Sequence, residues 1–294
     1  ATKQVLEFQP DAVVLVDFSG FNLRWAKKLR KAGYKGKIFY YISPKLWVWN
    51  SKRVNKVKAY IDEMFVILPF EVDFYKEHGF DAVHYIGNPL MDEIASFQAD
   101  DNFLDSHGIG EQPIVALLPG SRSGELKNML PMMLDLAQEF PDYQFAIAGV
   151  NWLKEDYPKY IGKHKIPIIF DDTYNLLANA RAAVVTSGTA TLEAGLFGVP
   201  QLVCYRGNEL SYRIAKQVVN VAHISLVNLI MNGPVLKEYI QSEMNLSNLT
   251  TELRVLLADG PRRESMISDY AKLKERVAGP GASDRAAEIM ARRL

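Results

Sequence analysis

Short apolar runs alternate along this chain with longer segments in which apolar residues recur every three or four positions. The first pattern predicts buried strands, and the second predicts amphipathic helices. We expect strands over 12–16, 37–42, 64–68, 82–86, 114–118, 144–148, 166–170, 182–185 and 201–205. We expect helices over 21–32, 70–77, 125–140, 174–180, 190–197, 208–221, 235–240 and parts of 246–294. This alternation predicts an α/β fold with parallel sheets that helices cover on both faces.

The stretch 114–125 carries the strongest local signal for a ligand site. Its five apolar residues end at a Pro-Gly pair, and Ser121, Arg122 and Ser123 then supply donors before a helix opens. Unpaired amides and a partial positive charge at a helix N-terminus attract anions such as phosphate. The stretch therefore predicts a phosphate site, although an ordinary strand-to-helix turn fits the local pattern equally well.

The same order of strand, turn and helix recurs at 182–197. The second turn contains Gly188 and Thr189, and Glu193 follows one turn inside the helix. Two such turns at one sheet edge can hold a diphosphate, and a carboxylate can accept both hydroxyl protons of a ribose. The alternative for Glu193 is an exposed acid that only complements the helix dipole.

Asp17 directly follows the apolar run 12–16 and precedes the helix predicted over 21–32. Ligands of open parallel sheets bind beyond the carboxyl ends of the strands. Asp17 is therefore a candidate for the chemistry of the first half of the chain.

A basic segment with two tryptophans covers 43–60. Trp47 and Trp49 lie among five cations, including Lys52 and Arg53, and the segment contains no acid. Such a segment suits a phosphate, an acyl chain or the headgroup region of a membrane. The alternative is a solvated helix face with two half-buried tryptophans.

The composition excludes several classes of protein. The chain has 34 basic and 34 acidic residues, and this balance argues against a nucleic-acid binder. The single cysteine, Cys204, lies in an apolar run and fits a buried thiol in a reducing cytoplasm. No run approaches the roughly 18 apolar residues of a membrane-spanning helix. Because no P-loop, HExxH motif or Cys/His cluster is present, we expect no bound metal and no cofactor.

The length of 294 residues favours two domains. We place an N-terminal domain at 1–98, a polar linker at 99–112 and a second domain at 113–259. The helices of 260–294 are expected to pack back on an N-terminal domain, either their own or that of a partner in a homodimer. The chain opens without Met inside a helical pattern, so we expect the first domain to be incomplete.

A diphosphate site in the second half suits a nucleotide-sugar enzyme, and the motifs point to one family. The chain resembles the lipid-A-disaccharide synthases, glycosyltransferases of the GT-B class with two Rossmann-like domains. The resemblance spans nearly the whole chain and rests on DFSGFN (17–22), the tryptophan-bearing segment (40–54), ILPFEVDFY (67–75), IGNPLMD (86–92), LLPGSR (117–122), TSGTATLE (186–193) and SLVNLI (225–230).

This resemblance implies transfer of 2,3-diacylglucosamine from its UDP derivative to 2,3-diacylglucosamine 1-phosphate. The products are the β-1,6-linked lipid A disaccharide 1-phosphate and UDP. It also implies inversion at the anomeric carbon without a metal, and peripheral association with the cytoplasmic face of the inner membrane in a Gram-negative bacterium.

The resemblance also implies residue roles. Asp17 would be the base or would orient the acceptor, and Arg122 would stabilise the departing diphosphate. The residues expected to bind substrate are Ser121, Gly188, Thr189, Glu193, Arg206, Asn228, Trp47, Trp49, Lys52 and Arg53. Asn228 would lie near the nucleotide, although an asparagine that caps a turn fits its surroundings as well.

The chain departs from the family pattern in two places. The Gly-rich opening strands of the family are absent from this sequence, and Gly20 stands where the family usually carries a second acid. The catalytic assignment therefore passes to Asp17 alone.

Two other kinds of function compete with the synthase reaction. One is another UDP-sugar enzyme of the same architecture, such as a UDP-N-acetylglucosamine epimerase or a different lipid-linked glycosyltransferase. The other is a non-catalytic nucleotide-sugar-binding protein, which would bind UDP and release no product.

Overall fold

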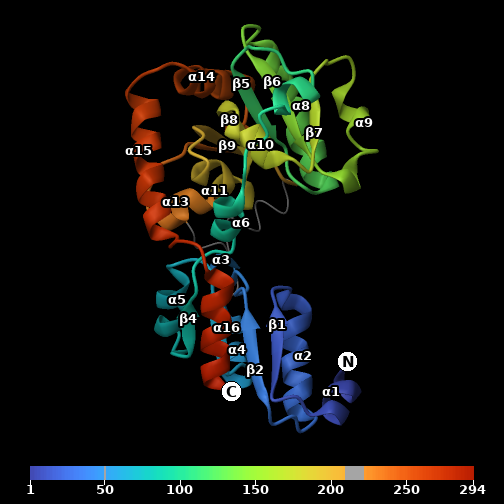
Figure 1. Ribbon diagram of the computed structural model, residues 1–294, viewed down its shortest axis with the longest axis vertical. Coiled ribbons are helices and arrows are strands. Elements are labelled where there is room, and N and C mark those ends of the chain that lie inside the picture. Colours follow the sequence, from blue (N-terminus) through green and yellow to red (C-terminus); the bar gives the residue numbers. More distant parts are fainter. Residues whose placement is uncertain (50, 209–221) are drawn as a thin grey trace. The chain divides into compact units, whose positions relative to one another are not determined.

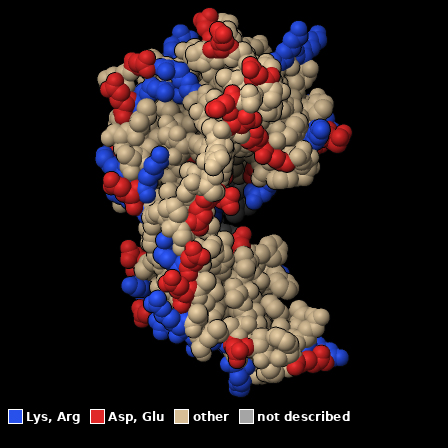
Figure 2. All heavy atoms as spheres, in the orientation of Figure 1, with Lys and Arg blue, Asp and Glu red and all other residues tan. Residues whose placement is uncertain are grey.

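A computed structural model describes residues 1–49, 51–208 and 222–294, with the Trp49 side chain outside the described part. It divides the chain into two compact units, which are described separately. Unit 1 contains residues 1–96 and 276–294, and unit 2 contains 97–208 and 222–275 of the described chain. Figure 1 shows the elements of each unit, and in Figure 2 basic and acidic side chains are interspersed over the visible surface.

Unit 1 is built on a four-stranded parallel sheet. Its strands, in spatial as well as chain order, are β1 (Ala12–Val16), β2 (Lys37–Tyr41), β3 (Glu63–Val66) and β4 (Val83–Tyr85). Its helical segments are α1 (Thr2–Phe8), α2 (Ser19–Lys31), α3 (Leu46–Trp49), η1 (Ser51–Arg53), α4 (Val54–Tyr60), α5 (Glu71–Glu77), α6 (Leu90–Ser96) and α16 (Ala282–Arg293).

Helices cover one face of this sheet and part of the other, because Val14 and Val16 of β1 remain 47% and 54% exposed although the unbroken apolar run predicts a strand buried on both faces. Ile38 and Tyr40 of β2 point into a core shared with α2, α4 and α5. Phe39, between them, packs on the opposite face with Ala286 of α16. Alternate side chains of one strand therefore lie in two separate cores, and the last helix of the chain closes the second one (Figure 1).

Unit 2 is built on a six-stranded sheet with the order β10-β9-β8-β5-β6-β7, and all of its strand pairs are parallel. The strands are β5 (Ile114–Leu118), β6 (Gln144–Gly149), β7 (Ile168–Phe170), β8 (Ala180–Thr186), β9 (Gln201–Tyr205) and β10 (Glu238–Ile240). The helical segments are α7 (Phe103–Ser106), α8 (Ser123–Gln138), η2 (Asn151–Leu153), α9 (Pro158–Ile161), α10 (Thr173–Ala178), α11 (Thr189–Leu196), α13 (Leu226–Met231), η3 (Gln241–Glu243), α14 (Leu246–Leu257) and α15 (Pro261–Arg276).

The structure confirms the α/β fold with two parallel sheets. Each of the nine predicted strands is present, with its ends within two residues of the expected ones. The helix predicted over 235–240 is wrong, because 238–240 forms β10 and pairs with β9. The segment is too short to nucleate a helix between Gly233-Pro234 and Gln241, which has φ +54°, and Tyr239 and Ile240 favour a strand. Most of the helix predicted over 208–221 lies outside the described residues.

Residues 99–112, for which we expected a polar connector, contain α7. Phe103 and Ile109 from this segment are buried in the core of unit 2. No helix among the described residues is long and apolar enough to cross a bilayer.

Candidate functional site

The carboxyl ends of β5 and β8 lie side by side in unit 2, because these strands are parallel neighbours. The sheet order reverses between them, since the chain runs outward from β5 through β6 and β7 and returns at β8. Ligands of open parallel sheets bind at such a reversal. The two turns that we predicted as a diphosphate site, 119–122 and 187–188, follow these two strands and therefore share this edge.

In the first turn, Glu125 folds back from α8 over the residues assigned to phosphate. One of its carboxylate oxygens accepts a hydrogen bond from the Ser121 amide (N···O 3.0 Å), and the other accepts one from the Arg122 guanidinium (2.9 Å). Gly120 has φ +104°, and a Cβ at this position would lie 2.4 Å from the Glu125 carboxylate. The Arg122 side chain remains 82% exposed, so most of it is accessible to a further anion.

Trp152 also contacts the first turn, and the sequence analysis did not single it out. Its indole N–H donates to the Ser121 carbonyl oxygen at 3.0 Å, while 70% of the residue is exposed. A lone tryptophan in a 3₁₀ turn between two strands carries no local signal of this contact.

The second turn joins β8 to α11 through Gly188. A Cβ added at Gly188 would meet no atom within 4 Å, so the space beside the turn is open. Thr189 is the first residue of α11, and Glu193 follows one turn later, half-buried. Burial raises the pKa of the Glu193 carboxyl, and no donor among the described residues offsets this rise. A half-buried carboxylate of this kind is suited to accept hydrogen bonds from a ligand.

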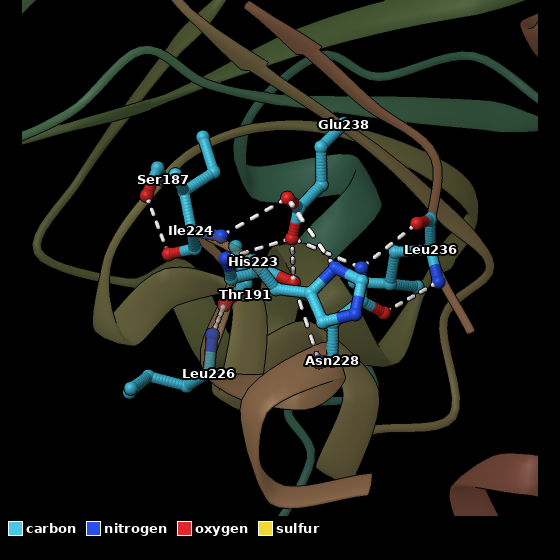
Figure 3. A network of polar contacts seen from close by, with 9 residues as sticks. Ser187, Thr191, His223, Ile224, Leu226, Asn228, Leu236 and Glu238 are labelled. Atoms are coloured by element: carbon cyan, nitrogen blue, oxygen red, sulfur yellow. Dashed lines mark hydrogen bonds and ion pairs between the residues drawn. The ribbon is translucent and has the colours of Figure 1, made fainter. Parts of the chain in front are cut away.

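Asn228 belongs to a hydrogen-bond network centred on Glu238 (Figure 3). The Glu238 carboxylate accepts bonds from the Ile224 amide (3.0 Å), from the Ser225 amide and hydroxyl (2.8 and 2.6 Å) and from the Asn228 side chain (2.9 Å). Asn228 also donates to the Leu236 carbonyl (2.9 Å) and accepts from the Leu236 amide (2.8 Å). Both ends of the Asn228 amide are therefore used within the chain.

This network also fixes the loop 223–226 beside the second turn. The Ser187 hydroxyl donates to the Ile224 carbonyl at 2.8 Å, and the Leu226 amide donates to the Thr191 hydroxyl at 3.2 Å (Figure 3). His223 Nδ1 lies 3.9 Å from a Glu238 oxygen. The loop is thus tied to β10 on one side and to α11 on the other.

Arg206 follows β9, the neighbour of β8, and so lies at the same edge of the sheet. Its guanidinium donates to the Met244 carbonyl. The thiol of Cys204, within β9, is fully buried, and burial raises its pKa to about 12, as expected for an inert thiol.

In unit 1, Asp17 lies in a tight turn between β1 and α2. Asp17 and Phe18 both have positive φ, +43° and +24°, which is rare for residues other than glycine. The Asp17 carbonyl accepts hydrogen bonds from the buried Tyr40 hydroxyl and from Asn22 Nδ2 (2.9 Å), and Asn22 also donates to the Val16 carbonyl (2.8 Å). Two side chains from the core therefore hold the backbone of this turn, while Asp17 itself is exposed.

The basic segment is anchored through Trp47. Its indole N–H donates to the Glu71 carboxylate at 3.0 Å, and its ring packs edge-on against Phe70. Glu71 is 1% exposed, and burial raises its pKa to about 7 despite hydrogen bonds from Trp47 and the Leu68 amide. The Trp49 side chain lies outside the described residues.

The predicted site residues therefore form two sets. Unit 2 brings Ser121, Arg122, Gly188, Thr189, Glu193, Arg206 and Asn228 to one edge of its sheet or into the loop beside it. Unit 1 carries Asp17, Trp47, Lys52 and Arg53. In the described part of the chain, no group of three or more His, Cys, Asp or Glu residues could hold a metal ion.

Comparison with known sequences shows one family across the chain. A family described as lipid-A-disaccharide synthetase matches residues 1–291. The lipid-A-disaccharide synthase of Syntrophus aciditrophicus is 38% identical, over 97% of this chain and 76% of that protein. The enzymes of the same name from Nitrosococcus oceani and Myxococcus xanthus are each 37% identical, over 96% of this chain and about three quarters of their own length (74% and 75%).

Solved structures support the fold. A UDP-GlcNAc 2-epimerase from Neisseria meningitidis, bound to UDP-GlcNAc, is similar with a TM-score of 0.70 at 14% identity, over 99% of this chain and 79% of that one. The calicheamicin glycosyltransferase CalG4 has a TM-score of 0.57 at 15% identity, over 99% and 75% of the two chains. At these identities the likeness concerns the two-domain α/β architecture alone.

Proposed function

The chain belongs to the lipid-A-disaccharide synthase family, and from this premise we propose that it forms the lipid A disaccharide by glycosyl transfer. The donor is UDP-2,3-diacylglucosamine, and the acceptor is 2,3-diacylglucosamine 1-phosphate. The products are the β-1,6-linked disaccharide 1-phosphate and UDP.

One observation carries this proposal: the family match covers residues 1–291, so it includes both the Asp17 turn and the two turns of unit 2. The arrangement at the reversal of the unit 2 sheet supports a UDP-sugar donor in particular. Two strand-to-helix turns meet there, with the exposed Arg122 beside one and the half-buried Glu193 beyond the other.

On the acceptor side, Asp17 takes the proton from the 6-hydroxyl group of the acceptor. The oxygen of that hydroxyl then forms a bond to the anomeric carbon of the donor, on the face opposite UDP. The bond between the anomeric carbon and the β-phosphate oxygen breaks, and its electrons leave with UDP. A base positioned for such a transfer contributes about 10²- to 10⁴-fold in rate.

On the donor side, Arg122, the Ser121 turn and the amides of Gly188 and Thr189 stabilise the charge that develops on the departing diphosphate. Glu193 accepts hydrogen bonds from the ribose hydroxyls. Arg206 and the loop shaped by Asn228 lie near the nucleotide. Because Glu125 holds the Ser121 amide and Arg122, a bound diphosphate shares or replaces these two contacts.

Binding at a membrane surface follows from the proposed substrates, which carry acyl chains. We propose that the protein works as a peripheral protein on the cytoplasmic face of the inner membrane, with the exposed Lys52 of the basic segment toward the lipid. A homodimer formed through the C-terminal helices, and catalysis without a metal, belong to the same proposal.

Mass spectrometry of the products tests this function directly. The protein is incubated with UDP-2,3-diacylglucosamine and 2,3-diacylglucosamine 1-phosphate in the presence of a chelator. We expect the disaccharide 1-phosphate from the wild type and at least a 100-fold lower rate from Asp17→Asn. Asparagine tolerates a positive φ, so this variant keeps the turn and removes the base.

Each competing function predicts a different outcome of this experiment. An epimerase changes UDP-N-acetylglucosamine in the absence of any acceptor. A nucleotide-sugar-binding protein binds UDP in a titration and forms no product. Either result from a folded wild-type protein overturns the synthase proposal.

A further inference from the structure

A basic hollow lies in unit 1 immediately after the Asp17 turn. It encloses about 250 Å³ and is lined by Ser19, Gly20, Leu23, Arg24, Arg53 and Lys56. Three of these six residues are cationic and none is acidic. Two of the cations, Arg24 and Lys56, were not among the predicted site residues.

Two helices and a short 3₁₀ segment bring the cations together. Arg24 lies on α2, Arg53 ends η1 and Lys56 lies on α4, and α2 packs against α4. The Arg24 Nε donates to the Gly20 carbonyl at 2.6 Å, which holds its guanidinium over the first turn of α2. Packing of the helices therefore fixes a cluster of positive charge that local sequence does not reveal.

The first turn of α2 adds hydrogen-bond donors to this charge. No side chain of the described chain caps this 13-residue helix at Phe18. The amides of Phe21 and Asn22 donate to the Phe18 carbonyl, whereas Ser19 and Gly20, the first two residues of the helix, line the hollow. A Cβ added at Gly20 would meet no atom within 4 Å, so the hollow is open at this point. Three cations and a helix N-terminus in one open hollow are complementary to a dianionic phosphate.

The surroundings of the hollow favour a phosphate carried on a lipid. Phe18 is 72% exposed and Phe21 is 48% exposed, on either side of the residues that open α2. Such exposed aromatic side chains beside a cationic hollow suit a ligand that joins a phosphate to apolar chains.

We infer that this hollow is the subsite for the phosphate monoester of the acceptor, with Arg24, Arg53, Lys56 and the first amides of α2 as its ligands. The inference rests on the proposed function, because it takes the phosphorylated lipid to be the acceptor. Ser19 is only two residues from Asp17, so a phosphate held here keeps the acceptor sugar close to the proposed base.

The test compares acceptors with and without the phosphate. The double variant Arg24→Gln/Lys56→Gln removes two cations from the hollow, and Lys27→Gln/Lys31→Gln removes two exposed cations of α2 that do not line it. We expect the first variant to raise the KM for 2,3-diacylglucosamine 1-phosphate at least about tenfold, with the KM for the donor unchanged. The rate with the dephosphorylated acceptor and the behaviour of the control variant should match the wild type.

Direct binding separates this inference from the proposed function. Glucosamine 1-phosphate, which has no acyl chains, is titrated into the wild type and both double variants by calorimetry, and we expect Arg24→Gln/Lys56→Gln alone to lose binding. Loss of binding in that variant supports the subsite even if the wild type forms no disaccharide. Equal binding in all three proteins overturns it.

A membrane headgroup is the other source of a lipid phosphate. If Arg24→Gln/Lys56→Gln loses binding to phosphatidylglycerol vesicles but keeps the wild-type KM for the phosphorylated acceptor in detergent, the hollow binds the membrane and the acceptor assignment is wrong.

Discussion

Asp17 and Phe18 adopt consecutive positive φ angles, a strained backbone conformation for residues other than glycine. Hydrogen bonds to the backbone carbonyls of Val16 and Asp17 stabilise this conformation. Asn22 supplies two of these bonds from within the buried part of α2. Asn22→Ala should therefore lower the free energy of unfolding by about 1–3 kcal/mol, because two carbonyls lose a donor. It should also reduce turnover, since the turn that carries Asp17 can relax.

Urea unfolding and product formation together check the role of Asn22. Asn55→Ala, at an exposed asparagine of α4, is the matched control and should resemble the wild type in both measurements. If Asn22→Ala lost stability and kept full activity, Asn22 would support the fold without positioning Asp17.

Titration of Glu71 makes the free energy of unfolding depend on pH. Its pKa is raised to about 7 by burial, from an ordinary value of 4.5, so the folded state keeps a proton that the unfolded chain releases between these values. The stability contributed by the protonated carboxyl is therefore full below about pH 4.5 and is lost as the pH rises through 7. Glu71→Gln should show a smaller fall in unfolding free energy between pH 5 and pH 8 than the wild type.

Glu77→Gln is the control for this comparison, because Glu77 is exposed at the other end of α5. It should show the same fall between the two pH values as the wild type. An equal pH dependence in all three proteins would mean that Glu71 titrates near its ordinary pKa.

These residue-scale contacts could not be predicted from the sequence. Trp47 pairs with Glu71 across 24 positions, and Glu125 reaches back to Ser121 only because Gly120 permits the approach. Local patterns indicate which residues are polar and where a turn lies. They do not indicate which donor a given carboxylate will meet after the chain has folded.

At the scale of elements, β10 shows how a tertiary contact determines the secondary structure of a short segment. The sequence analysis assigned 235–240 to a helix, but residues 238–240 pair with β9 as a strand. This pairing brings the Glu238 carboxylate into hydrogen-bond contact with the loop 223–226. Glu238→Gln keeps the size of the side chain and removes the charge that accepts four hydrogen bonds. We expect a loss of about 1–3 kcal/mol in unfolding free energy and a higher KM for the UDP-sugar donor, because the loop beside the second turn is released.

Isotherms for UDP binding, with urea unfolding, measure both effects of Glu238→Gln. Glu243→Gln changes an exposed carboxylate five residues away and should leave both quantities unchanged. Wild-type UDP affinity in a destabilised Glu238→Gln protein would show that the loop does not shape the nucleotide site.

Strands were predicted well because each is a short, mainly apolar run bounded by glycine, proline or polar residues. Strands 12–16, 114–118 and 201–205 match the structure at both ends. The order of strands in space is not contained in these runs. The strand order makes the turns after β5 and β8 neighbours, and the candidate diphosphate site depends on this adjacency.

At the scale of the whole molecule, the chain returns at its end to the unit in which it began. Arg285 of α16 donates to the carbonyl of Ile86 (2.8 Å) and to those of Gly279 and Pro280 (3.0 and 2.7 Å), and it anchors the helix beside β4. A helical pattern at 282–293 predicts the helix but does not show which sheet it covers. That information lies in contacts between residues nearly 200 positions apart.

Two adjacent alanines of α16 can test how much the packing of this helix on the sheet stabilises unit 1. Ala286 is 2% exposed and packs with Phe39, Phe65 and Ile86, whereas Ala287 is exposed. Ala286→Asp buries an unpaired carboxylate in this core and should lower the unfolding free energy of unit 1 by several kcal/mol, while Ala287→Asp should change it by less than about 0.5 kcal/mol. Because α16 belongs to unit 1, UDP binding by unit 2 should survive in both variants, as a calorimetric titration would measure. Loss of UDP binding in Ala286→Asp would show that unit 2 needs an intact unit 1 to hold the nucleotide. Equal unfolding free energies of the two variants would mean that α16 does not close this core.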